Sequence, residues 1–281
     1  MPTLDPIIVN PPKKQITQPL TVKDVQCIAK QVYFDSFGTN KVVVEIDGEY
    51  RTIQDFALLC ANAGASDIGK SVKISNLIPG ATIELKLVAL DHYDLANGRG
   101  KAHTVWQSFT ILNEYTYLGL PWDTVDNDND TAYSTNKGGY PTALGLIEQL
   151  EAIYNAFPKA FKDLIKTVEI PCYLPGYEIG DAKYINNIFV PSATEVGFSN
   201  ETDQNVPEDG DGTKYDYYEE GNGDDALALR LTKFLDGSGG YYWTRTPYLS
   251  APDSWYSVSD SGTVDYDTTV AYYGVAFAIC I

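Results

Sequence analysis

The stretch DSWYSVSDSGTVDYDTTVAYYG, residues Asp253–Gly274, is the most informative part of this sequence. Apart from one Trp, it is written in Tyr, Ser, Asp, Thr, Gly, Ala and Val. The tail around it, residues 246–281, contains no Lys, Arg, Glu, Gln, Met, His or Asn, although Lys and Glu are common elsewhere. Its short segments predict strands, with Gly262 in a turn and VAFAIC, residues 275–280, as a buried final strand.

Alternation along a strand assigns the side chains of this tail to two faces. The core-facing set is expected to be Tyr256, Val258, Val264 and Tyr266, and the outward set Trp255, Ser257, Ser259, Asp265 and Asp267. The outward set combines aromatic rings, hydroxyls and carboxylates. Tyr and Trp supply contact area at low entropic cost and the smaller groups supply adaptable hydrogen bonds, as in a paratope.

We therefore predict a ligand-binding surface on the tail, with Trp243, Arg245 and the last strand as its scaffold. An ordinary Tyr/Ser-rich pair of surface strands is the alternative interpretation. The predicted ligand-binding residues are Tyr241, Tyr248, Ser250, Asp253, Trp255, Ser257, Ser259, Asp265, Asp267, Thr269, Tyr272 and Tyr273.

The composition of the tail also fits adenine-directed mutagenesis. An Asn codon that changes only at its two adenines reaches Tyr, Ser, Asp, Thr, Ala, Gly, Val, Leu, Pro, Phe, Ile, His, Cys and Arg, but not Lys, Glu, Gln, Met or Trp. Between Tyr248 and Tyr273 the only residue outside the reachable set is Trp255. The pattern favours a diversified segment, and compositional bias alone is the alternative.

The chain has 281 residues and a formal net charge of −18. Such a charge disfavours nucleic acid and anionic membranes as partners. No apolar run is long enough for a membrane span, and the N-terminus MPTLDPIIVNPPKKQ does not resemble a signal peptide. We expect synthesis in the cytoplasm and a final location in a virion or another extracellular particle.

Few residues suggest catalysis or metal binding. The two histidines, His92 and His103, lie outside nucleophile motifs, so we expect surface or satisfied core histidines. The four cysteines are too far apart for a zinc site and are predicted to be buried thiols, at Cys27, Cys60, Cys172 and Cys280. We predict no catalytic residues, no metal site and no cofactor.

Two acidic loops leave a loose calcium site open as an alternative to simple solvated loops. The first contains Asp126, Asp128 and Asp130, but Thr131 and Lys137 stand where an EF-hand needs Gly and Glu. The second contains EDGDG, residues 208–212. Neither is an EF-hand.

Three regions are expected along the chain. Residues 1–19 are rich in proline and predict an extended arm. Residues 20–65 predict a small helix–hairpin–helix module for docking or oligomerisation, its hairpin closed at Asp47 and Gly48. Residues 66–281 predict the main domain, with short strands and two helices broken near Pro158, followed by the ligand-displaying tail 241–281.

The run YYWTRTPYLS, residues 241–250, and the strand-like segments after it resemble the C-terminal signature of C-type-lectin-like domains of phages and gut bacteria, which have the formylglycine-generating-enzyme-like fold. The matching positions are Trp243, Arg245, Thr246, Pro247, Gly262, Gly274 and Val275, while Ala276 and Phe277 replace an expected Arg-Pro. The likeness spans about residues 66–281. It implies an α+β, C-type-lectin-like domain with short antiparallel strands.

Some relatives in that fold are variable proteins of diversity-generating retroelements. The resemblance implies a non-enzymatic phage receptor-binding or tail-fibre protein that binds a host-cell protein or glycan. Other particle proteins would dock on the N-terminal module, and a homo-trimer would suit a fibre tip. A structural virion protein without a dedicated ligand and a surface-acting hydrolase or oxidase are the alternatives.

Overall fold

The computed structural model describes residues 42–112, 144–172, 183–199, 212–219, 224–234, 237–248, 254–268 and 273–281. They belong to one compact unit that extends from Val42 to Ile281. The predicted arm 1–19, residues 20–41 of the predicted module and the aspartates Asp126, Asp128 and Asp130 lie outside the described residues.

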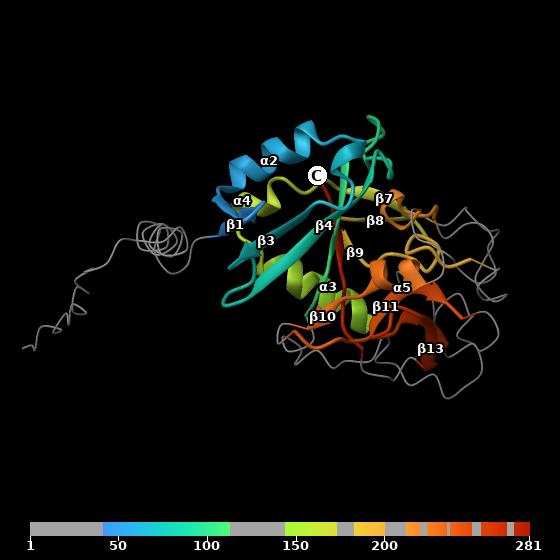
Figure 1. Ribbon diagram of the computed structural model, residues 1–281. Helices are drawn as coiled ribbons and strands as arrows, with labels where there is room; N and C mark the ends of the chain where they lie inside the picture. The colour runs from blue at the N-terminus through green and yellow to red at the C-terminus, as the bar shows by residue number, and fades with distance from the viewer. Residues whose placement is uncertain are drawn as a thin grey trace, which may run out of the picture. The chain divides into compact units, whose positions relative to one another are not determined.

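The described chain is a mixed α+β structure built around a seven-stranded antiparallel sheet (Figure 1). In order across the sheet, its strands are β2 (Glu49–Arg51), β1 (Val43–Ile46), β3 (Ser71–Ser75), β4 (Thr82–Leu90), β5 (Thr104–Ser108), β14 (Ala278–Cys280) and β9 (Ile188–Phe189). The predicted final strand is confirmed, because β14 is buried between β5 and β9.

Three small sheets complete the β-structure. They are β6 (Thr110–Ile111) with β10 (Lys233–Phe234), β7 (Val168–Pro171) with β8 (Lys183–Asn186), and the trio β11 (Tyr242–Pro247), β12 (Ser254–Val258) and β13 (Val264–Thr268). Only the pair β6–β10 is parallel among the described strands. The trio β11–β12–β13 contains four of the twelve predicted binding residues, Trp255, Ser257, Asp265 and Asp267.

Four α-helices and two 3-10 turns are described. They are α2 (Ile53–Asn62), α3 (Leu144–Ala156), α4 (Lys159–Lys162), α5 (Asp224–Arg230), η1 (Ala65–Asp67) and η2 (Asp216–Tyr218). The predicted break is confirmed, since Pro158 separates α3 from α4 as the N-cap of α4. No helix in the described part of the chain is long and apolar enough to span a bilayer.

The predicted boundary between residues 65 and 66 is wrong. The hairpin forms as expected, with positive φ at Asp47 (52°) and Gly48 (78°). However, β1 also pairs with β3, and Phe56 of α2 packs against Trp106 at 5.0 Å between ring centroids. A two-stranded hairpin buries too little surface to stand alone, so this segment adds its strands to the large sheet.

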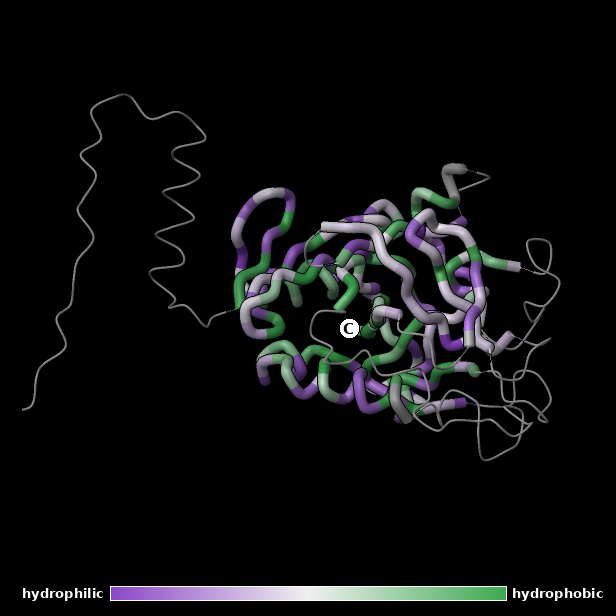
Figure 2. The backbone as a smooth tube through the Cα atoms, turned by 90° about the horizontal axis from the view of Figure 1, so that it is seen from below, coloured by the Kyte–Doolittle hydropathy of each residue, from purple (hydrophilic) through white to green (hydrophobic). Residues whose placement is uncertain are grey.

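The core lies between the sheet and the helices, and hydrophobic and hydrophilic residues alternate along both (Figure 2). The apolar stripe predicted for α3 is confirmed, because Leu146, Leu150, Ile153 and Phe157 are all buried. Phe157 also packs 5.6 Å from Phe277, just before β14. Helix α3 is thereby fixed against the segment that leads into the last strand.

The turn between β12 and β13 requires glycine, as predicted. Gly262 has a φ of +80°, and its N–H donates to the carbonyl of Ser259 at 3.0 Å. A Cβ at this position would collide with the backbone oxygen of Leu227 in α5. Both the backbone conformation and the packing against α5 therefore exclude a side chain at position 262.

Candidate functional site

The trio β11–β12–β13 positions the predicted binding residues through its register. On β12, Trp255 lies opposite Asp267, and Ser257 lies between Trp243 and Asp265. Opposed residues project to the same side of a sheet. The predicted division into two faces is therefore confirmed, with these five side chains on one face and Tyr256 and Tyr266 on the other.

Burial of β12 contradicts the outward position expected for three residues. The exposed fractions are 1% for Trp255, 0% for Ser257 and 4% for Ser259. All five residues of β12 are buried, so both of its faces are covered by other parts of the molecule. The Ser259 hydroxyl contacts the hydroxyls of Ser261 (2.8 Å) and Thr263 (2.6 Å) within the turn. Trp255, Ser257 and Ser259 therefore support the sheet and are not part of its exposed surface.

Tyr273 covers the Trp243 side of the trio. Its ring lies 4.6 Å from Trp243 and stacks on Tyr241 at 5.0 Å. Its hydroxyl donates to Asp267 Oδ2 at 2.7 Å, so the side chain reaches from β11 to β13. Partial burial, followed by this bond to a carboxylate, raises the pKa of Tyr273. The hydroxyl therefore stays protonated and acts as a donor.

Four predicted binding residues remain partly exposed on this side of the trio. We name this set the tyrosine–aspartate face, and it consists of Tyr241, Asp265, Asp267 and Tyr273. It combines two stacked phenol rings with two carboxylates on the edge strand β13. Such a set can accept hydrogen bonds and pack against apolar or cationic groups.

The opposite side of the trio carries a second aromatic pair. Tyr248 and Tyr266 are stacked almost parallel, with centroids 3.9 Å apart and an interplanar angle of 3°. The core-facing position expected for Tyr266 is wrong, because 48% of this residue is exposed. Tyr266 projects from the edge strand β13 and stays exposed, whereas Tyr256, on the same face of the central strand β12, is covered.

Four predicted binding residues lie outside the described ranges: Ser250, Asp253, Thr269 and Tyr272.

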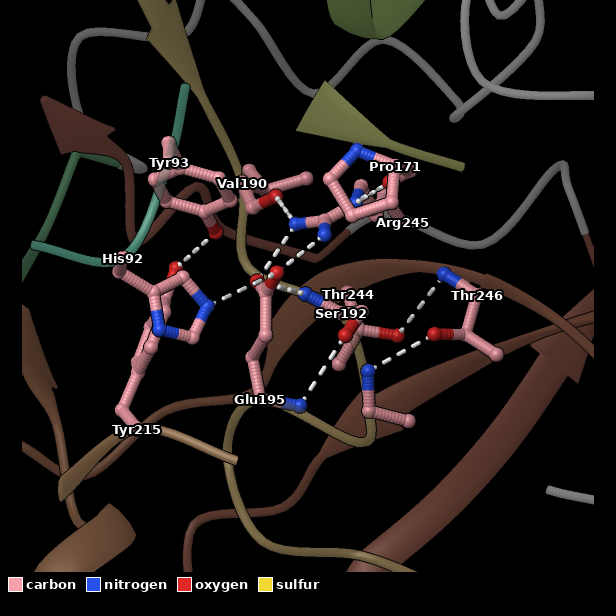
Figure 3. Close-up of polar contacts among 11 residues, drawn as sticks. His92, Tyr93, Pro171, Val190, Ser192, Glu195, Tyr215, Thr244, Arg245 and Thr246 are labelled. Atoms are coloured by element: carbon pink, nitrogen blue, oxygen red, sulfur yellow. Dashed lines mark hydrogen bonds and ion pairs between the residues drawn. The ribbon is translucent and has the colours of Figure 1, made fainter. Parts of the chain in front are cut away.

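A buried ion pair fixes β11 to the rest of the domain (Figure 3). Arg245 and Glu195 are both fully buried, and the guanidinium binds both oxygens of the carboxylate. Arg245 also donates to the carbonyls of Pro171 (2.9 Å) and Val190 (3.0 Å). The predicted scaffold role of Arg245 is confirmed by these contacts.

Glu195 is ionised despite its burial. Burial alone would raise its pKa, but the charge of Arg245, the nearby His92 ring and the hydrogen bonds from Arg245 outweigh burial and lower the pKa to about 2. The backbone N–H of Ser192 also donates to this carboxylate at 3.0 Å. Gly212 seals the site, since a Cβ there would collide with Glu195 Oε1.

A polar cavity of about 500 Å³ adjoins this ion pair. His92 lines it, with Nε2 3.9 Å from Glu195 Oε1 and the ring packed edge-on against Tyr93 and Tyr215. Since Arg245 already occupies both oxygens of Glu195, this carboxylate orients His92 and is a poor proton acceptor. Among the described residues that line the cavity there is no serine or cysteine.

Sequence reasoning missed the carboxylate and histidine of this cluster. The available signal was the lone Glu195 within the otherwise apolar and small-residue segment VPSATEVGF, residues 190–198. His103 is satisfied as predicted, with Nδ1 3.1 Å from Asp91 Oδ1 and Nε2 3.0 Å from the carbonyl of Ala63. Nothing in the residues around His92 indicated that it faces a cavity.

The described cysteines are buried, as predicted for Cys60, Cys172 and Cys280, while Cys27 lies outside the described residues. Burial raises the pKa of Cys60 to about 12 and that of Cys280 well above its usual value. Thiols in this state are poor nucleophiles. Within the described ranges, no three His, Cys, Asp or Glu side chains are grouped so that they could hold a metal ion.

Comparison with known proteins gives one family assignment. The comparisons with curated proteins and with solved structures found no match. A family model described as "Domain of unknown function (DUF6273)" matches residues 125–281, which include β7 to β14 and the whole tail. Since this match covers more than half of the sequence, the chain belongs to the DUF6273 family, a domain of unknown function.

Proposed function

We propose that this protein binds a ligand on a host-cell surface, a protein or a glycan, through the tyrosine–aspartate face of a C-type-lectin-like domain. It acts without catalysis. The observation that supports this function best is the partial exposure of Tyr241, Asp265, Asp267 and Tyr273 on a sheet whose central strand is fully buried. Rigid aromatic anchors next to adaptable polar groups are typical of evolved binding surfaces.

Pre-organisation of the face supports the proposal. Tyr273 is held by two ring contacts and one hydrogen bond, and β11 is held by Arg245 through its bonds to Glu195, Pro171 and Val190. A surface that is already ordered loses less conformational entropy when it binds. Affinity then depends on the exposed side chains, which can vary without loss of the fold.

The chemistry of the face indicates which groups the ligand presents. Asp265 and Asp267 are acceptors, and Tyr241 offers a partly exposed ring beside them. Carboxylates beside aromatic faces favour ammonium or guanidinium groups, or a hydroxyl-rich sugar that stacks on the ring. We therefore propose a basic protein patch or a glycan as the ligand.

The wider biological setting is part of the same proposal. The protein is a phage receptor-binding or tail-fibre protein, with a tail that a diversity-generating retroelement varies. It resides in a virion or extracellular particle, where the chain before Val42 contacts other particle proteins and three copies combine their binding faces for avidity. A second, adenine-rich copy of the tail's coding segment beside a reverse-transcriptase gene would support the diversification.

Direct binding of the full chain to bacterial cells and to a glycan array tests the proposed function. The variant D265N/D267N removes two charges from the face, and D163N/D216N removes the same charge elsewhere as a matched control. We expect about 30-fold weaker binding for the first variant, because the two carboxylates should contribute about 1 kcal/mol each, or about 2 kcal/mol together. Equal binding by both variants would exclude this face, and no binding by the unmodified chain would favour the structural alternative.

A further inference from the structure

A groove of about 500 Å³ lies on the outward side of β4, with β6 and β10 as its wall. The alternation of β4 places Thr82, Glu84 and Lys86 at the groove, while Ile83, Leu85 and Leu87 between them are buried. None of its lining residues belongs to the tyrosine–aspartate face. The groove is therefore a separate feature of the molecule.

Three lysines converge on this groove in a strongly acidic protein. Lys73 lies opposite Glu84 across β3–β4, Lys86 follows on β4, and Lys233 comes from β10 opposite Thr110. None of the three forms an ion pair within 4.0 Å among the described residues. Among the described residues, one carboxylate, Glu84, lines the groove with three lysines, and the Ser71 hydroxyl already donates to it at 2.6 Å. The described lining of the groove thus has an excess of positive charge.

Lys86 is held in a fixed position. Its Nζ lies 4.0 Å above the ring of Phe109 and 5.1 Å from that of Tyr217. The same ammonium donates to the Tyr217 hydroxyl at 3.1 Å. These contacts leave the ammonium with further protons to donate, because Lys has three. A pre-positioned cation loses little entropy when it binds an anion.

The wall of the groove adds apolar surface beside the lysines. Leu231 is 40% exposed, and Phe234 and Phe109 also line the space. Pockets for small organic molecules have a similar volume and also combine apolar walls with polar groups. The pattern differs from a solvated lysine patch, which has no adjoining apolar cavity.

We propose that this groove binds a small organic anion, with its phosphate or carboxylate group on Lys73, Lys86 and Lys233 and its apolar or aromatic part against Leu231 and Phe234. The net charge of −18 repels anions from the protein as a whole. Binding of an anion therefore has to be local, and the groove supplies the lysines that do it.

Ligand-observed and protein-observed NMR titrations of the full chain test this proposal with defined probes. The probes are phenyl phosphate and phenylacetate, which differ in head group, inorganic phosphate, which lacks the apolar part, and benzyl alcohol, which lacks the charge. We expect millimolar dissociation constants for the best probe, as is usual for fragments of this size. The affinities of phenyl phosphate and phenylacetate show whether the groove prefers a phosphate or a carboxylate. Binding of either probe supports the proposed anion site.

The variant K73Q/K233Q removes two of the three cations, and K159Q/K166Q makes the same charge change on lysines outside the groove. We expect at least about tenfold weaker binding for K73Q/K233Q and no change for the control. Thermal unfolding with and without probe supplies a second readout, since a ligand of the native state raises Tm. The proposal is overturned if neither charged aromatic probe binds, or if K73Q/K233Q binds them as tightly as the unmodified chain.

Discussion

The substitution Glu195→Gln tests how strongly the buried ion pair holds the C-terminal sheet in place. It keeps the size of the side chain but leaves the fully buried Arg245 without its counter-charge. The pKa of Glu195 falls from an ordinary 4.5 to about 2. At about 1.4 kcal/mol for each tenfold change in proton affinity, this corresponds to about 3 kcal/mol of stability at neutral pH. Removal of one partner from other buried pairs costs a similar amount, about 3–5 kcal/mol.

The pH dependence of this effect has a definite sign. A carboxylate whose pKa is lowered by folding stabilises the native state above its unfolded pKa, and the contribution disappears as the pH falls through the folded pKa. For Glu195 the contribution is complete above pH 4.5 and is lost towards pH 2. The difference in unfolding free energy between wild type and E195Q should therefore shrink to about 1 kcal/mol at pH 3.

Urea denaturation at pH 7 and pH 3, followed by tryptophan fluorescence, measures this difference. Trp243 and Trp255 are buried in the trio that Arg245 anchors, so their emission reports its unfolding. E169Q is the matched control, because Glu169 pairs with Lys183 at a partly exposed position and should cost less than about 1 kcal/mol. If E195Q had the same unfolding free energy as wild type at pH 7, the buried ion pair would not stabilise the fold as argued.

Three further predictions follow from local geometry. Gly262→Ala should lower the unfolding free energy by about 2 kcal/mol more than Gly237→Ala in thermal melts. Both glycines have positive φ, but of the two only a Cβ at Gly262 would collide with backbone, that of Leu227. Equal costs for the two substitutions would contradict this. Phe161→Ala should cost about 3–5 kcal/mol in urea, since its ring packs on Phe56 and Phe157 in the core; a cost below about 1 kcal/mol would show that the site is not packed as described. Cys60, with a pKa of about 12, should resist iodoacetamide at pH 8 in the native protein and react after unfolding, as read by peptide mass spectrometry; rapid native labelling would show that the thiol is exposed.

The sequence determined the local elements well, because their signals are local. The hairpin at Asp47 and Gly48, the helix break at Pro158, the glycine turn at 262 and the buried stripe of α3 are all present where their residues predict them. Each depends on backbone conformation or on the spacing of apolar residues over a few positions. Such preferences act within one element and need no distant partner.

The candidate site was predicted in part. Strand alternation assigned the two faces of the tail correctly and identified Asp265 and Asp267 as outward candidates, while the composition of the tail added Tyr241 and Tyr273. All four prove to be partly exposed. Strand alternation could not show that β12 is the central strand with both faces covered, so Trp255, Ser257 and Ser259 were placed outside. Alternation gives the face of a side chain, and only the neighbouring elements decide whether that face meets solvent.

By itself, the sequence determined the strands, turns and charge of this protein and the chemical character of its tail. Only the tertiary structure brought together residues that are far apart in the chain: Arg245 with Glu195 and His92, Lys233 with Lys73 and Lys86, and the hairpin at 43–51 with the large sheet. The physical reason is that burial and electrostatic pairing depend on distances in space. Those distances are set by the packing of the whole sheet and not by any local pattern of residues.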